Sequence, residues 1–206
     1  MGKESGTIVA FAGRRIDPTD VKTPRFPLNQ VDVVQKKIEE LFRRDNVKTL
    51  TCSAACGADL IALRVAQKLG IHYRIILPFV PERFLVTSVM DRPCTQEWNW
   101  SILFDQVIDI AQEKGELVVV ETDEDRQAAY QAVNLAILNE ALDQGRMQAG
   151  TGAPQEFYEV QAVIAWDGHA RGPRDLTLHF AEEARSRGLV VKEILTLPQA
   201  WEKVGG

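Results

Sequence analysis

The sequence predicts an α/β protein: a three-layer, Rossmann-like, doubly wound domain built on a mostly parallel sheet of about six strands. Two observations carry this prediction. Six short runs read as strands, and most of them are apolar continuously rather than alternately, which is typical of strands buried on both faces of a sheet. Between these runs, apolar residues recur at helical spacing. Strands that alternate with helices favour parallel pairing, with helices on both faces of the sheet.

The apolar runs give the order of the elements. The expected strands span residues 8–12, 47–52, 73–77, 117–120, 162–166 and 189–194. The expected helices include residues 31–42, 60–69, 100–110, 128–142 and 176–184. Gly70 and Gly188 each follow a basic helix end and precede a strand, as a helix-terminating glycine does. Two irregular segments remain, 15–29 and 143–159, and we expect the second to be either a mobile lid or disordered.

Length and composition narrow the class of protein. The 206 residues, 45% hydrophobic and 26% charged, fit one globular domain over residues 1–206. A net charge of −5 gives no basic field to attract nucleic acid, so we expect no nucleic-acid partner. No apolar run approaches the ~20 residues of a membrane span, and the first residues do not resemble a signal peptide. We therefore expect a cytoplasmic protein with no membrane partner.

Cysteine and histidine are too sparse for a metal site. The three cysteines form no CxxC pair, and the three histidines form no HExxH pattern. The sequence therefore predicts free thiols in a reducing compartment and no metal. Dinucleotide, P-loop and nucleophile-elbow motifs are missing as well, so no cofactor and no catalytic residue can be assigned.

The candidate ligand site lies in the loops that follow the strands, because ligands of open parallel sheets bind beyond the carboxyl ends of the strands. After the first strand, Gly13 allows close approach, and Arg14 and Arg15 offer guanidinium groups to a phosphate or carboxylate. A pair of surface arginines is the alternative. Pro78 follows the third strand, and Asp167 with Gly168 follows the fifth.

The loop after the second strand, CSAACGAD, combines three features. Its small residues leave the backbone accessible, Gly57 permits a tight turn, and the following helix directs its free N–H groups outward. The carboxylate of Asp59 would repel a phosphate if it pointed into the same space. We therefore expect Asp59 to cap the helix or to hold a ribose hydroxyl. A capped turn without a ligand is the alternative. Candidate residues here are Ser53, Ala55, Gly57, Ala58 and Asp59.

Two further groups complete the candidates. Arg174 and Thr177 lie at the start of the last helix, a second possible anion site. Tyr130 and Asn134 lie one turn apart on an otherwise apolar helix, where a buried amide needs a partner that is structural or a ligand.

Six blocks together resemble the SLOG superfamily of Rossmann-like nucleotide-ligand domains. They are FAGRR (11–15), AACGADLIAL (54–63), ILPF (76–79), RFLVTSV (83–89), AYQAVNLAIL (129–138) and AVIAWDG (162–168). The resemblance covers residues 7–195 and is strongest to the bacterial branch related to the sensor domain of melastatin-type TRP channels. It implies a pocket for a nucleotide or nucleotide-derived molecule, with Gly13 and Arg14 in the first ligand loop.

The resemblance also implies ligand roles for Ala55, Gly57, Ala58 and Asp59, for Tyr130 and Asn134, and for Asp167 and Gly168. The related LOG phosphoribohydrolases carry a PGGxGT turn and a catalytic glutamate, whereas this chain reads GHARGPRDLT. Pro173 removes an N–H donor from that turn, which puts hydrolase chemistry in doubt.

Three functions follow as hypotheses. The first is a sensor or carrier of a nucleotide-derived small molecule. The second is a nucleotide N-glycosidic hydrolase using one of four carboxylates, Glu97, Glu121, Asp123 or Asp167. The third is a protein-interaction module without a ligand. A homo-oligomer is compatible with each.

Overall fold

The computed structural model describes residues 6–120, 126–150 and 158–198 of the chain. Its strands are β1 (Gly6–Gly13), β2 (Val47–Cys52), β3 (His72–Leu77), β4 (Leu117–Val119), β5 (Tyr158–Trp166) and β6 (Val190–Leu195). Its α-helices are α1 (Val31–Arg44), α2 (Ala58–Leu69), α3 (Pro81–Ser88), α4 (Trp100–Glu113), α5 (Arg126–Gly150) and α6 (Leu176–Ser186). A 3₁₀ turn, η1 (Leu28–Gln30), leads into α1.

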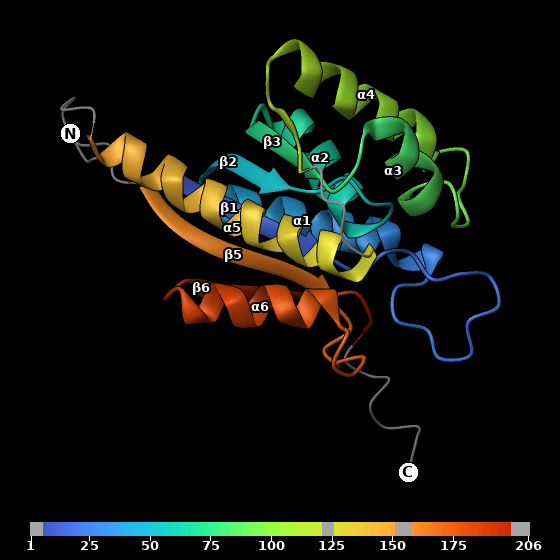
Figure 1. Cartoon of the computed structure of the whole chain (residues 1–206). Coiled ribbons are helices and arrows are strands. Elements are labelled where there is room, and N and C mark those ends of the chain that lie inside the picture. The colour runs from blue at the N-terminus through green and yellow to red at the C-terminus, as the bar shows by residue number, and fades with distance from the viewer. Residues whose placement is uncertain (1–5, 121–125, 151–157, 199–206) are drawn as a thin grey trace.

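The strands form one sheet in the order β4-β3-β2-β1-β5-β6, and all five pairings are parallel. The chain proceeds outward from β1 to β4 and then crosses back to place β5 on the other side of β1. The strand order therefore reverses between β1 and β5, where doubly wound sheets bind their ligands. The arrowheads of β2 and β5 point to the same side in Figure 1.

Helices cover both faces of this sheet, which confirms the predicted fold class. Alternate residues of β1 enter different cores: Val9 and Phe11 pack with α1, α2 and α4, whereas Ile8 and Ala10 pack with α5 and α6. Because both sets are fully buried, β1 is the centre of the molecule, as a continuous apolar run predicts. Figure 1 shows α5 passing across one face of the sheet, with α6 beside β5 and β6.

Glycine ends two helices as expected. Gly70 has φ of +67°, and the N–H of Ile71 donates to the carbonyl of Ala66 at 2.9 Å, which closes the last turn of α2. Gly188, with φ of +77°, follows α6 in the same way. Both glycines let the chain turn sharply into the next strand.

The prediction of an irregular segment over residues 143–159 is wrong for the part that the structure describes. Helix α5 continues to Gly150, and β5 has begun by Tyr158; residues 151–157 lie outside the described residues. The segment is rich in glycine, alanine and glutamine, a composition typical of a loop, but a Cβ atom on its first glycine, Gly145, would lie 2.6 Å from Val160 Cγ2. The glycine is therefore explained by the close passage of α5 over β5 and not by a turn.

Candidate functional site

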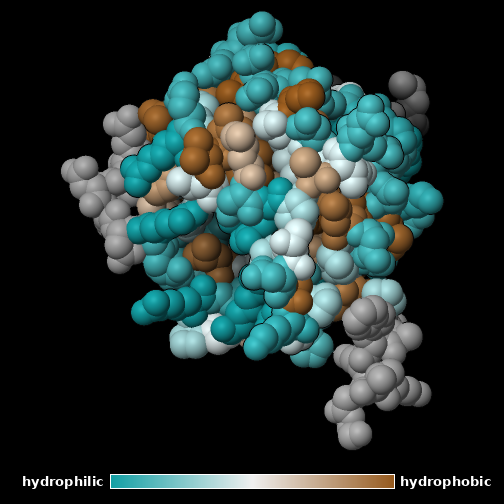
Figure 2. All heavy atoms as spheres, turned by 90° about the vertical axis from the view of Figure 1, so that its right-hand side faces the viewer, coloured by the Kyte–Doolittle hydropathy of each residue, from teal (hydrophilic) through white to brown (hydrophobic). Residues whose placement is uncertain are grey.

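A cavity of about 430 Å³ opens at the reversal point, beyond the end of β1. This volume lies in the range of small-molecule sites, about 300–1,000 Å³. Figure 2 looks onto this edge of the sheet and shows apolar side chains exposed between polar ones. Apolar side chains from β1, α3, α5 and α6 make up much of the lining: Phe11, Ala12, Phe84, Val133, Ile137 and Leu176.

Gly13 ends β1 at the wall of the cavity, where the chain itself leaves no room for a side chain. A Cβ atom on Gly13 would lie 2.4 Å from the Cβ of Ala58 and 3.0 Å from the carbonyl oxygen of Ala165. The glycine thus lets α2 and β5 approach β1. Its role in the fold is packing, whatever binds beside it.

Close packing also explains Gly57, which lies at the start of α2. Its φ of +102° suits glycine, and a Cβ atom would lie 2.8 Å from the carbonyl oxygen of Arg14. The loop after β1 crosses here, because Arg15 and Gly57 form an antiparallel bridge and the Ala58 N–H donates to the Arg14 carbonyl at 3.1 Å. The chain therefore already uses the Ala58 amide that the sequence assigned to a phosphate.

Asp59 is the buried carboxyl group of the cavity wall. Asp59 is 6% exposed, and its Oδ2 accepts from the Ala55 N–H at 3.3 Å. The Gly13 N–H lies near the carboxyl group and favours its charged form, but Oδ1 makes no hydrogen bond of ordinary geometry to the described residues. Burial raises the pKa of Asp59 to about 7, against the lowering effect of the Ala55 and Gly13 amides and of the Arg15 charge. Near neutral pH this carboxyl group can therefore either donate or accept a hydrogen bond.

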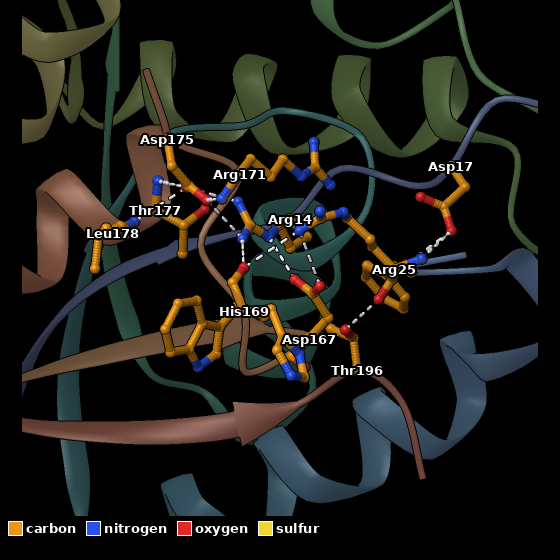
Figure 3. A network of polar contacts seen from close by, with 12 residues as sticks. Arg14, Asp17, Arg25, Asp167, His169, Arg171, Asp175, Thr177, Leu178 and Thr196 are labelled. Carbon is orange, nitrogen blue, oxygen red and sulfur yellow. Dashed lines mark hydrogen bonds and ion pairs between the residues drawn. The ribbon is translucent and has the colours of Figure 1, made fainter. Parts of the chain in front are cut away.

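Arg14 lies outside the lining of the cavity and belongs to a network of ion pairs and hydrogen bonds (Figure 3). Its Nη1 and Nη2 donate to the two carboxylate oxygens of Asp175 at 2.6 and 2.7 Å. Its Nε donates to Asp167 at 3.0 Å, and Nη2 also donates to the carbonyl of His169 at 2.7 Å. Every guanidinium nitrogen is thus paired within the protein, and the residue is 4% exposed. This placement differs from the expected phosphate contact.

Asp175 occupies the N-terminus of α6. Besides Arg14, its carboxylate accepts from the N–H groups of Arg171, Thr177 and Leu178 at 2.7, 3.0 and 3.1 Å. Burial alone would raise the pKa of Asp175, but the hydrogen bonds from Arg14 and from these backbone amides hold it below its ordinary value. The carboxylate therefore stands where a helix N-terminus would otherwise hold an external anion.

Arg15, not Arg14, is the arginine of this loop that lines the cavity. It pairs with Asp91 and lies 3.8 Å from the sulfur of Cys56, while its buried Nε has no hydrogen-bond partner in the described part of the chain. A second guanidinium, that of Arg126, reaches the lining from the first turn of α5 and donates to the carbonyl of Thr87 at 2.7 Å.

Helices α3 and α5 form the remaining wall. The hydroxyl groups of Ser88 and Tyr130 are 2.5 Å apart, and the Tyr130 ring meets that of Phe79 edge-on at 6.1 Å. Asn134 donates to the carbonyl of Leu176 at 2.8 Å, which ties α5 to the first residue of α6. The buried amide thus has a structural partner, the first of the two roles expected for it.

The structure gathers eight predicted site residues around the cavity: Gly13, Arg15, Ser53, Ala55, Asp59, Tyr130, Asn134 and Thr177. Seven others lie outside its lining: Arg14, Gly57, Ala58, Pro78, Asp167, Gly168 and Arg174. The sequence reasoning missed the apolar lining residues and also Ser88, Arg126 and Gln127. Of these, Val133 and Ile137 share one face of α5 with Tyr130, and that spacing is visible in the sequence.

Of the four carboxylates proposed for hydrolysis, the two that the structure describes, Glu97 and Asp167, lie outside the cavity lining. Glu97 is exposed and outside the lining, and Asp167 is engaged by Arg14 and by Arg25. Glu121 and Asp123 lie outside the described residues. Within the described ranges, no three His, Cys, Asp or Glu side chains lie close enough together to hold a metal ion. In the same ranges, no helix combines the length and apolarity needed to cross a membrane.

Comparison with known proteins assigns no family to the chain. No protein-family model and no curated protein matches the chain. Among solved structures, the chain is similar to the X-ray structure of DNA processing protein A (DprA) from Streptococcus pneumoniae, with a TM-score of 0.48 and 14% identity. The match covers 92% of this chain and 53% of that one, so the chain spans about half the length of that protein. What the coordinates themselves establish is a Rossmann-like α/β domain with an all-parallel sheet.

Proposed function

We propose that this chain binds a nucleotide-derived small molecule in the cavity beyond β1, as a sensor or carrier of that molecule. The observation that carries the proposal is Asp59, a buried carboxyl group in the cavity wall whose Oδ1 lacks a partner among the described residues. A buried polar atom without a partner is costly, by about 1–3 kcal/mol, and a bound molecule removes that cost by pairing with it.

The position and lining of the cavity support the same function. It lies at the reversal point of the strand order, where doubly wound sheets bind ligands, and its apolar walls suit the flat faces of a heterocycle. Tyr130 adds an aromatic ring to the wall. The SLOG-like sequence blocks agree with a nucleotide-derived ligand at this edge of the sheet.

A second function, hydrolysis of an N-glycosidic bond, draws support from the pKa of Asp59 near 7, which suits a general acid at neutral pH. The bond from the anomeric carbon to the base would break, the base would take the proton of Asp59, and water would supply the hydroxyl group and restore that proton. Chromatography of nucleosides and nucleoside monophosphates after incubation tests this function. Release of free base supports it, and intact substrate across the panel excludes it.

Thermal denaturation with a panel of bases, nucleosides and nucleotides tests the binding proposal. At a ligand concentration of 100 Kd the stabilisation is about 2.7 kcal/mol, which corresponds to a rise in Tm of roughly 5–10 °C for a chain of this size. The Asp59→Asn variant should lose most of that rise. Asp105→Asn, which changes an exposed carboxylate on α4, is the matched control and should keep it.

If no compound of the panel raises the Tm of the wild-type chain, the proposed function is wrong. An equal rise in Asp59→Asn would contradict the role of Asp59, the observation on which the assignment of the ligand to this cavity rests. A panel in which no compound raises the Tm would favour the third hypothesis, a protein-interaction module without a ligand.

A further inference from the structure

Two helix N-termini beside the cavity, those of α2 and α6, already have N–H donors engaged by the chain itself. In a doubly wound fold, phosphate groups bind at helix N-termini next to the carboxyl ends of the strands. Three helices begin beside the cavity, since Asp59 of α2, Arg126 of α5 and Leu176 of α6 all line it. The residues that precede Arg126 lie outside the described residues, so the N-termini that can be compared are those of α2 and α6. What occupies these two N-termini therefore bears on the charge of the ligand.

At α6 the occupant is the carboxylate of Asp175. It accepts hydrogen bonds from three backbone N–H groups and from both terminal nitrogens of Arg14. Backbone amides at a helix start combined with a guanidinium fork are the donors that hold a phosphate in other proteins. The protein thus supplies its own anion, and a phosphate would have to displace a buried, five-fold hydrogen-bonded carboxylate.

At α2 the donors are also reduced. The Ala58 N–H is used by the Arg14 carbonyl, and the crossing loop approaches Gly57 so closely that a Cβ atom would not fit. The carboxyl group of Asp59 lies in the first turn of the same helix. When it is ionised, it repels a phosphate at this end; when it is protonated, it no longer attracts a cation.

The unpartnered atoms of the lining favour an uncharged ligand over a phosphate. Among the described residues, Oδ1 of Asp59 and Nε of Arg15 are buried without hydrogen bonds, and both residues line the cavity. One is an acceptor, or a donor when protonated, and the other is a donor. A nitrogen heterocycle that carries a ring N–H and a carbonyl offers a partner to each, and its faces match the apolar walls.

We therefore propose that the cavity takes an unphosphorylated nucleobase or nucleoside, and that Asp175, clamped by Arg14, fills the position that a phosphate takes in phosphate-binding relatives of this fold. This inference rests on the proposed function, whose ligand class it narrows. Arg15 and Arg126 do not overturn it, because Arg15 is paired with Asp91 and Arg126 donates to a backbone carbonyl.

Calorimetric titration of the wild-type chain tests the inference. The affinities of guanosine, uridine and adenosine are each compared with the affinity of the corresponding 5′-monophosphate. We expect at least one nucleoside to bind at least as tightly as its monophosphate, since the chain itself already engages N–H groups at the N-termini of α2 and α6. A monophosphate that binds more tightly than its nucleoside in every pair overturns the inference and leaves the proposed function standing. No binding of either member of any pair overturns both.

Two variants of Asp175 test the internal anion directly. Asp175→Ser keeps a residue able to cap the helix but removes the charge and opens space, so affinity for inorganic phosphate and for the monophosphates should rise roughly tenfold. Asp175→Asn keeps the volume of the side chain and should show no such gain. A folded Asp175→Ser chain without any gain contradicts the role assigned to this carboxylate. If that variant does not fold, the wild-type titration still decides the ligand class.

Discussion

The two terminal nitrogens of Arg14 donate to the two carboxylate oxygens of Asp175, at 2.6 and 2.7 Å, across 161 residues of sequence. This buried pair joins the end of β1 to the start of α6. Asp167 extends it to the end of β5 and, through Arg25, to the loop that follows β1 (Figure 3). The pair therefore organises the strand ends around the reversal point without lining the cavity.

Removing one partner of this pair should destabilise the protein strongly. Arg14→Met leaves the carboxylate of Asp175 buried without its bidentate partner, which costs about 3–5 kcal/mol in the free energy of unfolding. Urea denaturation measures this cost. The control is Arg43→Met, which breaks an exposed i,i+4 pair with Glu39 and should cost less than about 1 kcal/mol. Equal losses in the two variants would show that burial does not matter to the Arg14 pair.

Asp59 should make stability depend on pH in the direction opposite to most carboxylates. The folded chain holds the Asp59 proton up to pH about 7, whereas an unfolded chain releases it near the ordinary value of 3.8. Between these values the folded state binds more protons, so the free energy of unfolding falls as pH rises. The ionised form above pH 7 costs roughly 4 kcal/mol relative to an ordinary aspartate.

The Asp59→Asn variant isolates this effect, because asparagine does not titrate. Its stability relative to wild type should improve from pH 4.5 to about pH 7 and then level off, measured by urea denaturation in the absence of ligand. Asp105→Asn should show a flat difference over the same range. A flat difference for Asp59→Asn as well would mean that Asp59 titrates like an exposed carboxylate.

Gly57→Ala should cost more than its positive φ alone explains. Gly57 and Gly188 both have φ in the left-handed range, but a Cβ atom on Gly188 would meet nothing within 4 Å, while one on Gly57 would meet Arg14 and Ile16 backbone at 2.8 Å. Gly188→Ala should therefore lose only about 1–2 kcal/mol from its backbone conformation. Gly57→Ala should lose clearly more, measured by urea denaturation. Similar losses would show that the loop after β1 can withdraw from α2.

The sequence predicted the fold well because its signals are local. Strand-like runs, most of them continuously apolar, located all six strands, and Gly70 and Gly188 marked helix ends from their immediate neighbours. Gly145 misled because its small size serves a contact with Val160, fifteen positions away and on a different element. The sequence alone does not distinguish a glycine that allows close packing of a helix from a glycine that forms a loop, because the packing partner is distant in sequence.

The site was predicted in part for the same reason. The small residues around Asp59 belong to one turn, and that turn does form the cavity wall. Arg14 and Arg15 are adjacent, and the neighbouring sequence does not indicate which of the two lines the cavity and which is buried in ion pairs outside its lining. The answer depends on Asp175 and Asp167, more than 150 residues further along the chain, so their pairing with Arg14 appears only in three dimensions.

Native mass spectrometry of the gently purified chain tests the central claim most directly, because it weighs the protein together with any molecule held in the cavity. The expected spectrum shows an added mass equal to that of a nucleobase or nucleoside, which is absent from Asp59→Asn and present in Asp105→Asn. A wild-type chain that stays at its bare mass after addition of each base and nucleoside, or an adduct that persists unchanged in Asp59→Asn, would contradict the account.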